Sequence, residues 1–504
     1  MSIRRLLIAN RGEIAVRIIR ACRELGISTV AVYSEADVDA RHVGEADITV
    51  AIGPAPARES YLNIDRIIAA ARETEADAVH PGYGFLSERA PFARACEQAG
   101  LVFVGPPAAA LERMGSKIGA RQLMLAAQVP VVPGEAPRDQ SNTALSEAAT
   151  RVGYPILVKP SAGGGGIGMR VARSAAELPD ALNGARREAK ASFGDHTLYL
   201  ERLIDRPRHV EIQVFADAHG NTMHLFEREC SAQRRHQKTI EESPCMALSG
   251  AVRERMGAAA IAAARAVGYR NAGTCEFLLE GSGDDARFYF LEMNTRLQVE
   301  HPVTEAVVGV DLVHAQLRVA AGEPLPFSQG AISQRGHAIE CRIYAEDPAQ
   351  DFLPQAGTIL LYHEPHGPGI RIDSGVAQGS VVSVHYDPLL AKLIVSAESR
   401  DAARRRAIVA LRNYAILGIR TNIPFLLQLL EHPDFENAAI DTGFLDREAA
   451  HLAAKAPTEL PTAAQAATEF HRTLGTHANQ TQATPGAAGA RGRDPFVSLK
   501  GFRV

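Results

Sequence analysis

The first hundred residues alternate between short apolar runs and stretches with helical spacing, and this alternation restricts the possible folds more than any other feature. Residues 6–9 form an apolar run, and apolar side chains between 15 and 22 recur three and four positions apart. The pattern predicts a strand followed by a helix, with further strands at 28–33, 76–79 and 101–104. Strands that alternate with helices pair in parallel and are covered on both faces. We therefore predict an N-terminal doubly wound α/β lobe.

Composition and missing motifs argue against several classes of protein. Only Gly12 follows the first predicted strand, where a dinucleotide-binding fingerprint needs a G-x-G-x-x-G run, so an NAD-dependent dehydrogenase is not expected. The formal net charge of −4 argues against general binding to nucleic acid. The cysteines contain no C-x-x-C pair, and no apolar run reaches the length of a membrane span. These features predict a reduced, cytoplasmic protein without a zinc ribbon, a nucleic-acid partner or a membrane segment.

Changes in composition divide the 504 residues into several regions. A stretch of small and polar residues at 133–144 precedes a strand at 154–159, the pattern becomes strand-rich after Arg335, and few large apolar residues follow position 450. We predict an N-terminal Rossmann-like domain at 1–115 and a second domain at 116–330, which contains a lid lobe at about 134–203. A mixed α+β domain is expected at 331–450, and a disordered tail at 451–504.

A glycine-rich segment at 161–170 lies between two predicted strands. It does not match a P-loop, because Gly168 is followed by Met169 and Arg170 where that motif needs Lys and Ser or Thr. Consecutive glycines allow the backbone to approach a ligand closely, and their N–H groups can surround phosphate oxygens. We interpret the segment as a hairpin flap over phosphates; the alternative is a flexible surface turn.

Two strand patterns flank a turn-forming segment at 281–286 and predict a hairpin. A hairpin centred near residue 284 places Glu276 opposite Glu292, and side chains in such a pair lie about 5 Å apart. Two neighbouring carboxylates repel each other unless a cation lies between them, and their hard oxygen atoms suit magnesium. The alternative is a pair of solvated strand glutamates. A shift of one residue in the pairing would remove the argument.

Polar and apolar residues alternate after this hairpin, which predicts that the strand continues to Val299 and ends before Pro302. One face would carry five polar side chains: Glu292, Asn294, Arg296, Gln298 and Glu300. This mixture suits an anionic substrate, although a solvated strand face has a similar pattern. The basic cluster at 233–238 is followed by two glutamates and contains no aromatic residue, so it fits a phosphate or bicarbonate pocket better than a nucleic-acid surface.

The chain resembles the biotin carboxylases, which are ATP-grasp enzymes, from residue 8 to about residue 443. The blocks that carry the resemblance are 8–15, 80–88, the glycine flap, 208–213, 233–238, 292–302 and 336–342. The resemblance implies an ATP-grasp domain at 116–330 and a biotin carboxylase C-terminal domain at 331–450. It also implies a ligase that forms a C–N bond with hydrolysis of ATP to ADP and phosphate. Carboxyphosphate would be the intermediate, and biotin would be carboxylated on a carrier protein.

The resemblance assigns roles to individual residues as well. The implied cofactors are ATP and two magnesium or manganese ions. ATP would be bound by Lys117, Lys159, Gly164, Gly165, Gly166, Met169, Glu201, Ile204, His209, Gln233, His236 and Leu278. Metal would be held by Glu276, Glu292 and Asn294. Glu300 would be the general base for bicarbonate, and Arg342 would stabilise the biotin enolate. Lys238, Arg296, Gln298 and the Val299 backbone would position the anion.

The resemblance also implies partner proteins, and a few positions differ from the family pattern. No lysine follows a methionine, so the biotin attachment motif is absent and we expect a separate biotin carboxyl carrier protein, with a carboxyltransferase subunit and a homodimer. Acetyl-CoA carboxylase, fatty acid biosynthesis or a related acyl-CoA or pyruvate carboxylase is the expected context. Three positions depart from the family pattern. Ile167 stands where the family usually carries Arg or Lys, Arg202 stands in place of a common Lys, and Tyr344 stands where Asn is frequent. The alternatives are a ligase that joins a carboxylate to an amine and a catalytically silent nucleotide-binding paralogue.

Overall fold

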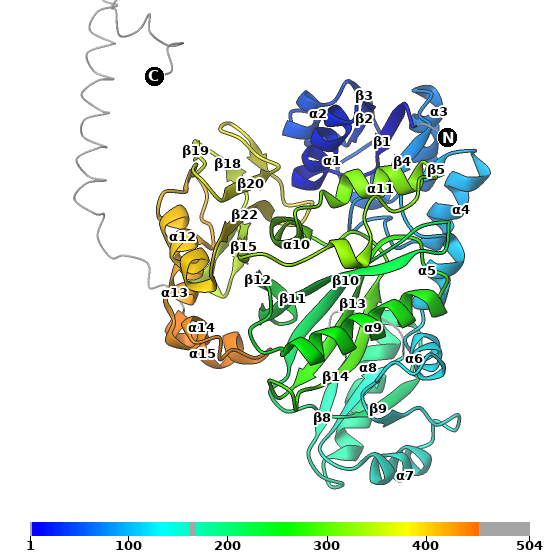
Figure 1. Ribbon diagram of the computed structural model, residues 1–504. Coiled ribbons are helices and arrows are strands. Elements are labelled where there is room, and N and C mark those ends of the chain that lie inside the picture. Colours follow the sequence, from blue (N-terminus) through cyan, green and yellow to red (C-terminus); the bar gives the residue numbers. More distant parts are fainter. Residues whose placement is uncertain (1–2, 162–167, 453–504) are drawn as a thin grey trace, which may run out of the picture. The chain divides into compact units, whose positions relative to one another are not determined.

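The N-terminal lobe is built on five parallel strands in the order β3-β2-β1-β4-β5 (Figure 1). The structure is a computed structural model that describes residues 3–161 and 168–452, apart from the side chains of Lys117, Phe193 and Ala450. The strands are β1 (Arg5–Ile8), β2 (Ser28–Tyr33), β3 (Ile48–Ala51), β4 (Ala78–His80) and β5 (Val102–Phe103). The helices are α1 (Gly12–Glu24), α2 (Arg41–Glu45), α3 (Ile64–Glu73), α4 (Ala90–Gln98) and α5 (Ala108–Met114).

Both faces of this parallel sheet are covered, as the continuous apolar strands require. Leu6 and Ile8 of β1 belong to the buried cluster that contains Ile18 of α1. Leu7 belongs to the opposite cluster, which contains Ile67 of α3. The predicted doubly wound lobe is therefore confirmed.

An eight-stranded antiparallel sheet forms the centre of the described chain, in the order β14-β13-β10-β11-β12-β15-β22-β20. Its strands are β10 (Arg208–Ala216), β11 (Thr222–Arg234), β12 (Gln237–Ser243), β13 (Asn271–Glu280), β14 (Arg287–Asn294), β15 (His337–Tyr344), β20 (Ile370–Ser374) and β22 (Leu389–Ala397). Helices α6 (Lys117–Ala126), α9 (Gly250–Ala266), α10 (His301–Val308) and α11 (Leu312–Ala320) accompany it. The sheet contains strands from both sides of residue 330, so its side chains can converge from distant parts of the sequence.

A smaller sheet with the order β6-β9-β7-β8 forms the lid lobe. Its elements are β6 (Gly134–Glu135), α7 (Asn142–Val152), β7 (Ile156–Pro160), β8 (Arg170–Ala172), α8 (Leu178–Phe193) and β9 (Leu198–Arg202). Buried residues of α7, α8 and this sheet form a separate apolar cluster. The flap residues 162–167 and the predicted tail from 453 onward lie outside the described residues.

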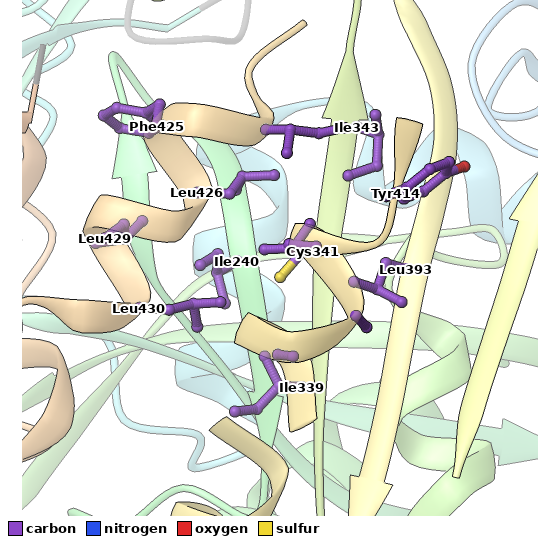
Figure 2. Close-up of a cluster of buried hydrophobic side chains, with 14 of the residues drawn as sticks. Ile240, Ile339, Cys341, Ile343, Leu393, Tyr414, Phe425, Leu426, Leu429 and Leu430 are labelled. Carbon is purple, nitrogen blue, oxygen red and sulfur yellow. The ribbon is translucent and has the colours of Figure 1, made fainter. Parts of the chain in front are cut away.

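The C-terminal lobe packs helices against β15 and β22. The helices are α12 (Arg400–Arg412), α13 (Ile423–Glu431), α14 (Pro433–Glu436) and α15 (Phe444–Leu452). Figure 2 shows Ile339, Cys341 and Ile343 of β15 together with Leu426 and Leu430 of α13 in one apolar cluster. Short strand pairs complete the lobe: β16 (Glu346–Asp347) with β17 (Leu353–Pro354), β18 (Gly357–Thr358) with β21 (Val381–Val382), and β19 (Leu361–His363) with β23 (Ala415–Leu417).

The predicted strand from 291 to 299 is wrong in its second half. Strand β14 ends at Asn294, and residues 295–300 form a loop and turn that lead into α10. The backbone N–H of Thr295 donates to Glu88 Oε1 at 3.0 Å, so a side chain of the N-terminal lobe replaces a strand partner. Pro302 occupies the first turn of α10, where its fixed φ suits a helix start. Within the described ranges, no helix is both long enough and apolar enough to cross a membrane.

Candidate active site

The ammonium group of Lys238 lies among three carboxylates. Its Nζ atom is 2.5 Å from Glu211 Oε2, 2.8 Å from Glu276 Oε1 and 2.6 Å from Glu300 Oε1. Glu211, Lys238 and Glu276 come from strands β10, β12 and β13 of the central sheet. Glu300 occupies the N-cap position of α10. The three acids are buried, so their charges interact through a medium of low dielectric.

Each of the three carboxylates has a second cationic partner. Arg228 Nε donates to Glu211 Oε1 at 2.6 Å, and Arg342 Nη2 donates to Glu300 Oε2 at 3.0 Å. His209 Nε2 lies 3.0 Å from Glu276 Oε2. The cluster therefore contains nearly balanced charge, which a buried group of three acids requires.

These neighbours keep Glu276 and Glu300 ionised. Burial alone would raise the pKa of Glu276, but the charges of Lys238 and His209 outweigh it and lower that pKa. Burial likewise opposes ionisation of Glu300, whereas Lys238, Arg342 and Arg228 bring its pKa well below the usual range. Burial disfavours the charged form of His209, and the Glu276 carboxylate raises its pKa nevertheless. The site thus presents negatively charged oxygen atoms and protonated nitrogen atoms side by side.

Glu276 and Glu292 are direct cross-strand partners on β13 and β14, which confirms the predicted pairing. Thr274 pairs with Asn294 on the same two strands. Asn294 Nδ2 donates to Glu276 Oε1 at 2.7 Å. Opposed residues of an antiparallel pair lie on one face of the sheet. Two carboxylates and an amide group therefore lie in one small region, and oxygen donors of this kind suit a magnesium ion.

The loop after β14 brings the remaining polar residues to the same region without a strand. Arg296 Nη1 donates to Gln298 Oε1 at 2.8 Å, and Arg296 Nη2 donates to Asn294 Oδ1 at 3.1 Å. Gln298 Nε2 donates to Glu276 Oε1 at 3.1 Å. The predicted grouping of these side chains is therefore present, but hydrogen bonds within the loop maintain it instead of strand periodicity.

The lid lobe contributes a second pair of charges. Lys159 Nζ on β7 donates to Glu201 Oε2 on β9 at 2.6 Å. Burial lowers the pKa of Lys159, but the Glu201 charge reverses this effect and leaves that pKa raised. Arg202 pairs with Glu280 at 2.9 Å and Ile204 is buried. The described part of the structure does not include the side chain of Lys117 or residues Gly164, Gly165, Gly166 and Ile167.

Four further residues from the sequence prediction lie on or beside these two sheets. Gln233 is the register partner of Lys238, and Leu278 is the partner of His209. His236 is exposed in the turn between β11 and β12, and Met169 follows the flap. Gln233 and Leu278 are therefore adjacent to the Lys238 cluster through strand pairing.

Comparisons with known proteins agree with this architecture. The family model described as biotin carboxylase, N-terminal domain, matches residues 2–111, and that described as biotin carboxylase C-terminal domain matches 340–447. Between them, the model for the carbamoyl-phosphate synthase L chain ATP binding domain matches 116–328. The biotin carboxylase of Halalkalibacterium halodurans is 51% identical over 442 residues, which cover 88% of this chain and 97% of that protein. The chain belongs to the biotin carboxylase family.

Solved structures and longer relatives extend the comparison. A biotin carboxylase complex from Campylobacter jejuni aligns with a TM-score of 0.85 and 47% identity, covering 88% of this chain and 99% of the other. The mitochondrial α-subunit of methylcrotonoyl-CoA carboxylase from Rattus norvegicus is 52% identical over 88% of the chain. The chain spans only 62% of that relative's length. The predicted ATP-grasp fold and membership of a family of ATP-dependent ligases are confirmed.

Several residues of the candidate site were not predicted from the sequence. Glu211 and Arg228 form an ion pair beside Lys238, and Glu241 accepts from Arg342 Nε at 2.5 Å. The alternation in block 208–213, which places Glu211 on the same strand face as His209, was a usable signal for Glu211. No pattern along β11 distinguishes Arg228, because its partners come from other strands.

Proposed function

We propose that this chain carboxylates biotin on a separate carrier protein, with ATP and bicarbonate, through a carboxyphosphate intermediate. The observation that carries the proposal is the position of the Glu300 carboxylate between Lys238 and Arg342. An ionised acid beside two cations can remove a proton from a bound anion while the cations hold that anion. This constellation matches the needs of bicarbonate activation better than those of amide formation.

Bicarbonate is a poor electrophile, so its carbon atom needs a leaving group. Glu300 would remove the bicarbonate proton, and the resulting oxygen nucleophile would attack the γ-phosphorus of ATP as ADP departs. Lys238, Arg296, Gln298 and the Val299 backbone would hold the anion in line for this attack. Engagement of Lys238 by the anion would weaken its hold on Glu300, and so would raise the pKa of that base toward its working range.

The second half-reaction transfers the carboxyl group. Carboxyphosphate would break into carbon dioxide and phosphate, and the phosphate would take the proton from N1 of biotin. Negative charge would then develop on the ureido oxygen of biotin, where Arg342 is the proposed stabilising cation, and N1 would attack carbon dioxide to form the N–C bond. Arg342 is buried and is held by Glu241 and Glu300, which fixes its guanidinium before biotin arrives.

Nucleotide and metal would occupy the region between the lid and the central sheet residues. The residues proposed for ATP are Lys117, Lys159, Gly164, Gly165, Gly166, Met169, Glu201, Ile204, His209, Gln233, His236 and Leu278. Glu276, Glu292 and Asn294 would hold divalent metal, because their oxygen atoms are hard donors and the Glu276 carboxyl is ionised. When bound, the metal would neutralise charge on the phosphate oxygens.

The relatives support a proposal for the acceptor and the partners. The named relatives include α-subunits of methylcrotonoyl-CoA carboxylase from rat, mouse and plants, so an acyl-CoA is the acceptor class we favour. These relatives are named for methylcrotonoyl-CoA and not for acetyl-CoA, so acetyl-CoA carboxylase and fatty acid biosynthesis stay predictions. A carrier protein and a carboxyltransferase are the proposed partners. The biotin carboxylase domain of the 2-oxoglutarate carboxylase of Hydrogenobacter thermophilus was solved as a dimer, which supports a homodimer here.

ATP hydrolysis that depends on both bicarbonate and free biotin tests the proposal. We expect this activity in the purified chain and its loss in Glu300→Gln, with Asp285→Asn on the exposed hairpin turn as the control. Hydrolysis that depends instead on a carboxylate and an amine would identify another type of ATP-grasp ligase. Nucleotide binding without hydrolysis would identify a silent paralogue. Either result would contradict the proposal.

A further inference from the structure

Lys392 on β22 is fully buried, and its ammonium group contacts the loop that precedes α10. Its Nζ atom donates to the carbonyl oxygen of Val299 at 2.8 Å. It also lies 3.4 Å from Glu13 Oε1 and 3.9 Å from Asp373 Oδ2. Burial disfavours the charged form of Lys392, but Glu13 and its other acidic neighbours raise the pKa of this group, so it remains an ammonium. Fully buried lysines are rare and are retained where the charge is paired.

Strand pairing places Lys392 beside the proposed biotin-stabilising cation. Arg342 on β15 and Lys392 on β22 are direct cross-strand partners, and Asp373 on β20 is the partner of Lys392 on its other side. Partners of this kind lie on the same face of a sheet. Arg342 contacts the Glu300 carboxylate and Lys392 contacts the Val299 carbonyl, so neighbouring cations hold consecutive residues of one turn.

The contact to Val299 fixes the orientation of a peptide group. A peptide unit is planar, and its C=O and N–H bonds point in opposite directions. Holding the Val299 oxygen toward β22 therefore fixes the direction of the Glu300 N–H and the start of the Glu300 side chain. The preceding carbonyl is held too, because His301 Nδ1 lies 2.8 Å from the Gln298 oxygen. Burial lowers the pKa of His301 well below its usual value, so the neutral ring can serve as a donor through Nδ1.

The partners of Lys392 connect this turn to two other parts of the fold. Glu13 belongs to α1 of the N-terminal lobe and accepts a hydrogen bond from the Tyr83 hydroxyl. Asp373 belongs to β20 and is held by Arg371 at 2.7 Å. Both acids are buried, so they fix the ammonium as well as offsetting its charge. The position of the Val299 oxygen is thereby determined by residues far from it in the sequence.

We infer that Lys392 is a positioning residue for the bicarbonate site, because its hydrogen bond to the Val299 carbonyl sets the geometry of the turn that carries Glu300. The inference rests on the proposed function, in which this turn binds bicarbonate. Lys392 acts only through the backbone, so its loss should affect bicarbonate much more than nucleotide. It is one of seven lysines in a chain that otherwise uses arginine, and a lysine offers a single compact donor.

Steady-state kinetics of Lys392→Met in the full chain tests the inference. We expect KM for bicarbonate to rise by about tenfold or more, with KM for ATP within about twofold of the wild type. Arg404→Met is the matched control. Arg404 is also a buried cation that donates to a backbone carbonyl, that of Leu430 at 3.0 Å, but it lies in the C-terminal lobe away from the turn. The control should leave the ratio of the two KM values unchanged.

A second variant covers the case in which Lys392→Met does not fold because the buried Glu13 carboxylate loses its cation. Lys392→Met combined with Glu13→Gln removes a cation and its nearest anion together, and it should show the same selective rise in KM for bicarbonate. Lys392→Arg retains the charge and should recover part of the loss. Equal changes in both KM values, or no change in bicarbonate KM in a folded variant, would overturn the inference. If the wild-type chain shows no bicarbonate-dependent ATP hydrolysis, that result would instead overturn the proposed function.

Discussion

Glu276 lies opposite Glu292 only because strand β14 contains one extra residue. Closer to the hairpin turn, Phe277 pairs with Phe290, and a regular register would continue with Leu291 opposite Glu276. The register shifts at this point, so Leu291 forms a bulge and Glu292 becomes the partner of Glu276. Such bulges redirect side chains near functional sites. Here the bulge is what brings two carboxylates of the proposed metal site together.

Removing either carboxylate of this pair should weaken metal binding. We expect Glu276→Gln and Glu292→Gln to raise the magnesium concentration needed for half-maximal ATP hydrolysis by about 10- to 100-fold, because each replaces a charged oxygen ligand by an amide. Asp285→Asn also removes one negative charge from the same hairpin, but at an exposed position in the turn, and it should leave magnesium dependence unchanged. Unaltered magnesium dependence in both glutamine variants would mean that the pair does not hold metal.

Replacing Lys238 should leave three buried carboxylates with too little positive charge. Lys238→Met is expected to abolish bicarbonate-dependent hydrolysis and to lower the free energy of unfolding at pH 7 by about 3–5 kcal/mol. Lys238 holds the pKa values of Glu276 and Glu300 low, so its stabilising effect is present above the pKa of an unfolded glutamate and is lost as pH falls.

Urea unfolding at several pH values measures this effect. The difference between Lys238→Met and the wild type should be largest at pH 7 and should shrink toward pH 4, because the buried acids of the variant take up protons there and those of the wild type do not. Lys190→Met, at an exposed lysine of α8, is the control and should change stability little at either pH. A difference that is independent of pH would show that packing, and not charge, accounts for the loss.

His80 should make the N-terminal lobe sensitive to mild acid. The ring is fully buried between Gln316 and the N–H of Gly82, which donates to Nδ1 at 3.0 Å. Burial lowers the pKa of His80 to about 4. The unfolded chain binds a proton at this histidine near pH 6.5, whereas the folded chain does not until about pH 4, so stability falls as pH decreases between these values.

A His80→Gln variant should reduce this dependence by up to about 3 kcal/mol across that interval, since one pKa unit corresponds to about 1.4 kcal/mol. The measurement is the free energy of unfolding from urea titrations between pH 7 and pH 4. His363→Gln, at an exposed histidine of β19, should retain the wild-type slope. Identical slopes in all three proteins would show that His80 is not the group responsible.

Local patterns in the sequence were sufficient for much of the fold. The doubly wound lobe was predicted from apolar periodicity, and the strands expected at 28–33, 76–79 and 101–104 correspond to β2, β4 and β5. The pairing of Glu276 with Glu292 was predicted correctly, although the assumed symmetric hairpin is absent near the turn. A bulge depends on how β14 packs against β13, which a pattern along one strand does not contain.

The parts of the site that the sequence did not reveal depend on contacts between distant segments. Polar alternation predicted a strand through Val299, but Glu88 of the N-terminal lobe binds the Thr295 backbone and the chain turns there. Arg228 and Lys392 carry no recognisable pattern, because their partners come from other strands of the sheet. Periodicity reports which face of an element a residue occupies, whereas convergence of charges requires the tertiary fold.

Substitutions in the apolar cluster on one face of β15 should lower stability without affecting bicarbonate binding at the other, polar face. Ile339, Cys341 and Ile343 point into the cluster shown in Figure 2, whereas Arg342 alternates with them and faces the site. Leu426→Ala removes a fully buried side chain from this cluster and should lower the free energy of unfolding by about 2–5 kcal/mol. Leu360→Ala, at a leucine that is 68% exposed, should lower the free energy of unfolding by less than about 0.5 kcal/mol.

KM for bicarbonate should stay at its wild-type value in both variants at temperatures where they are folded. A rise in that KM in Leu426→Ala would show that the cluster also sets the position of Arg342, and that the two faces of β15 are coupled.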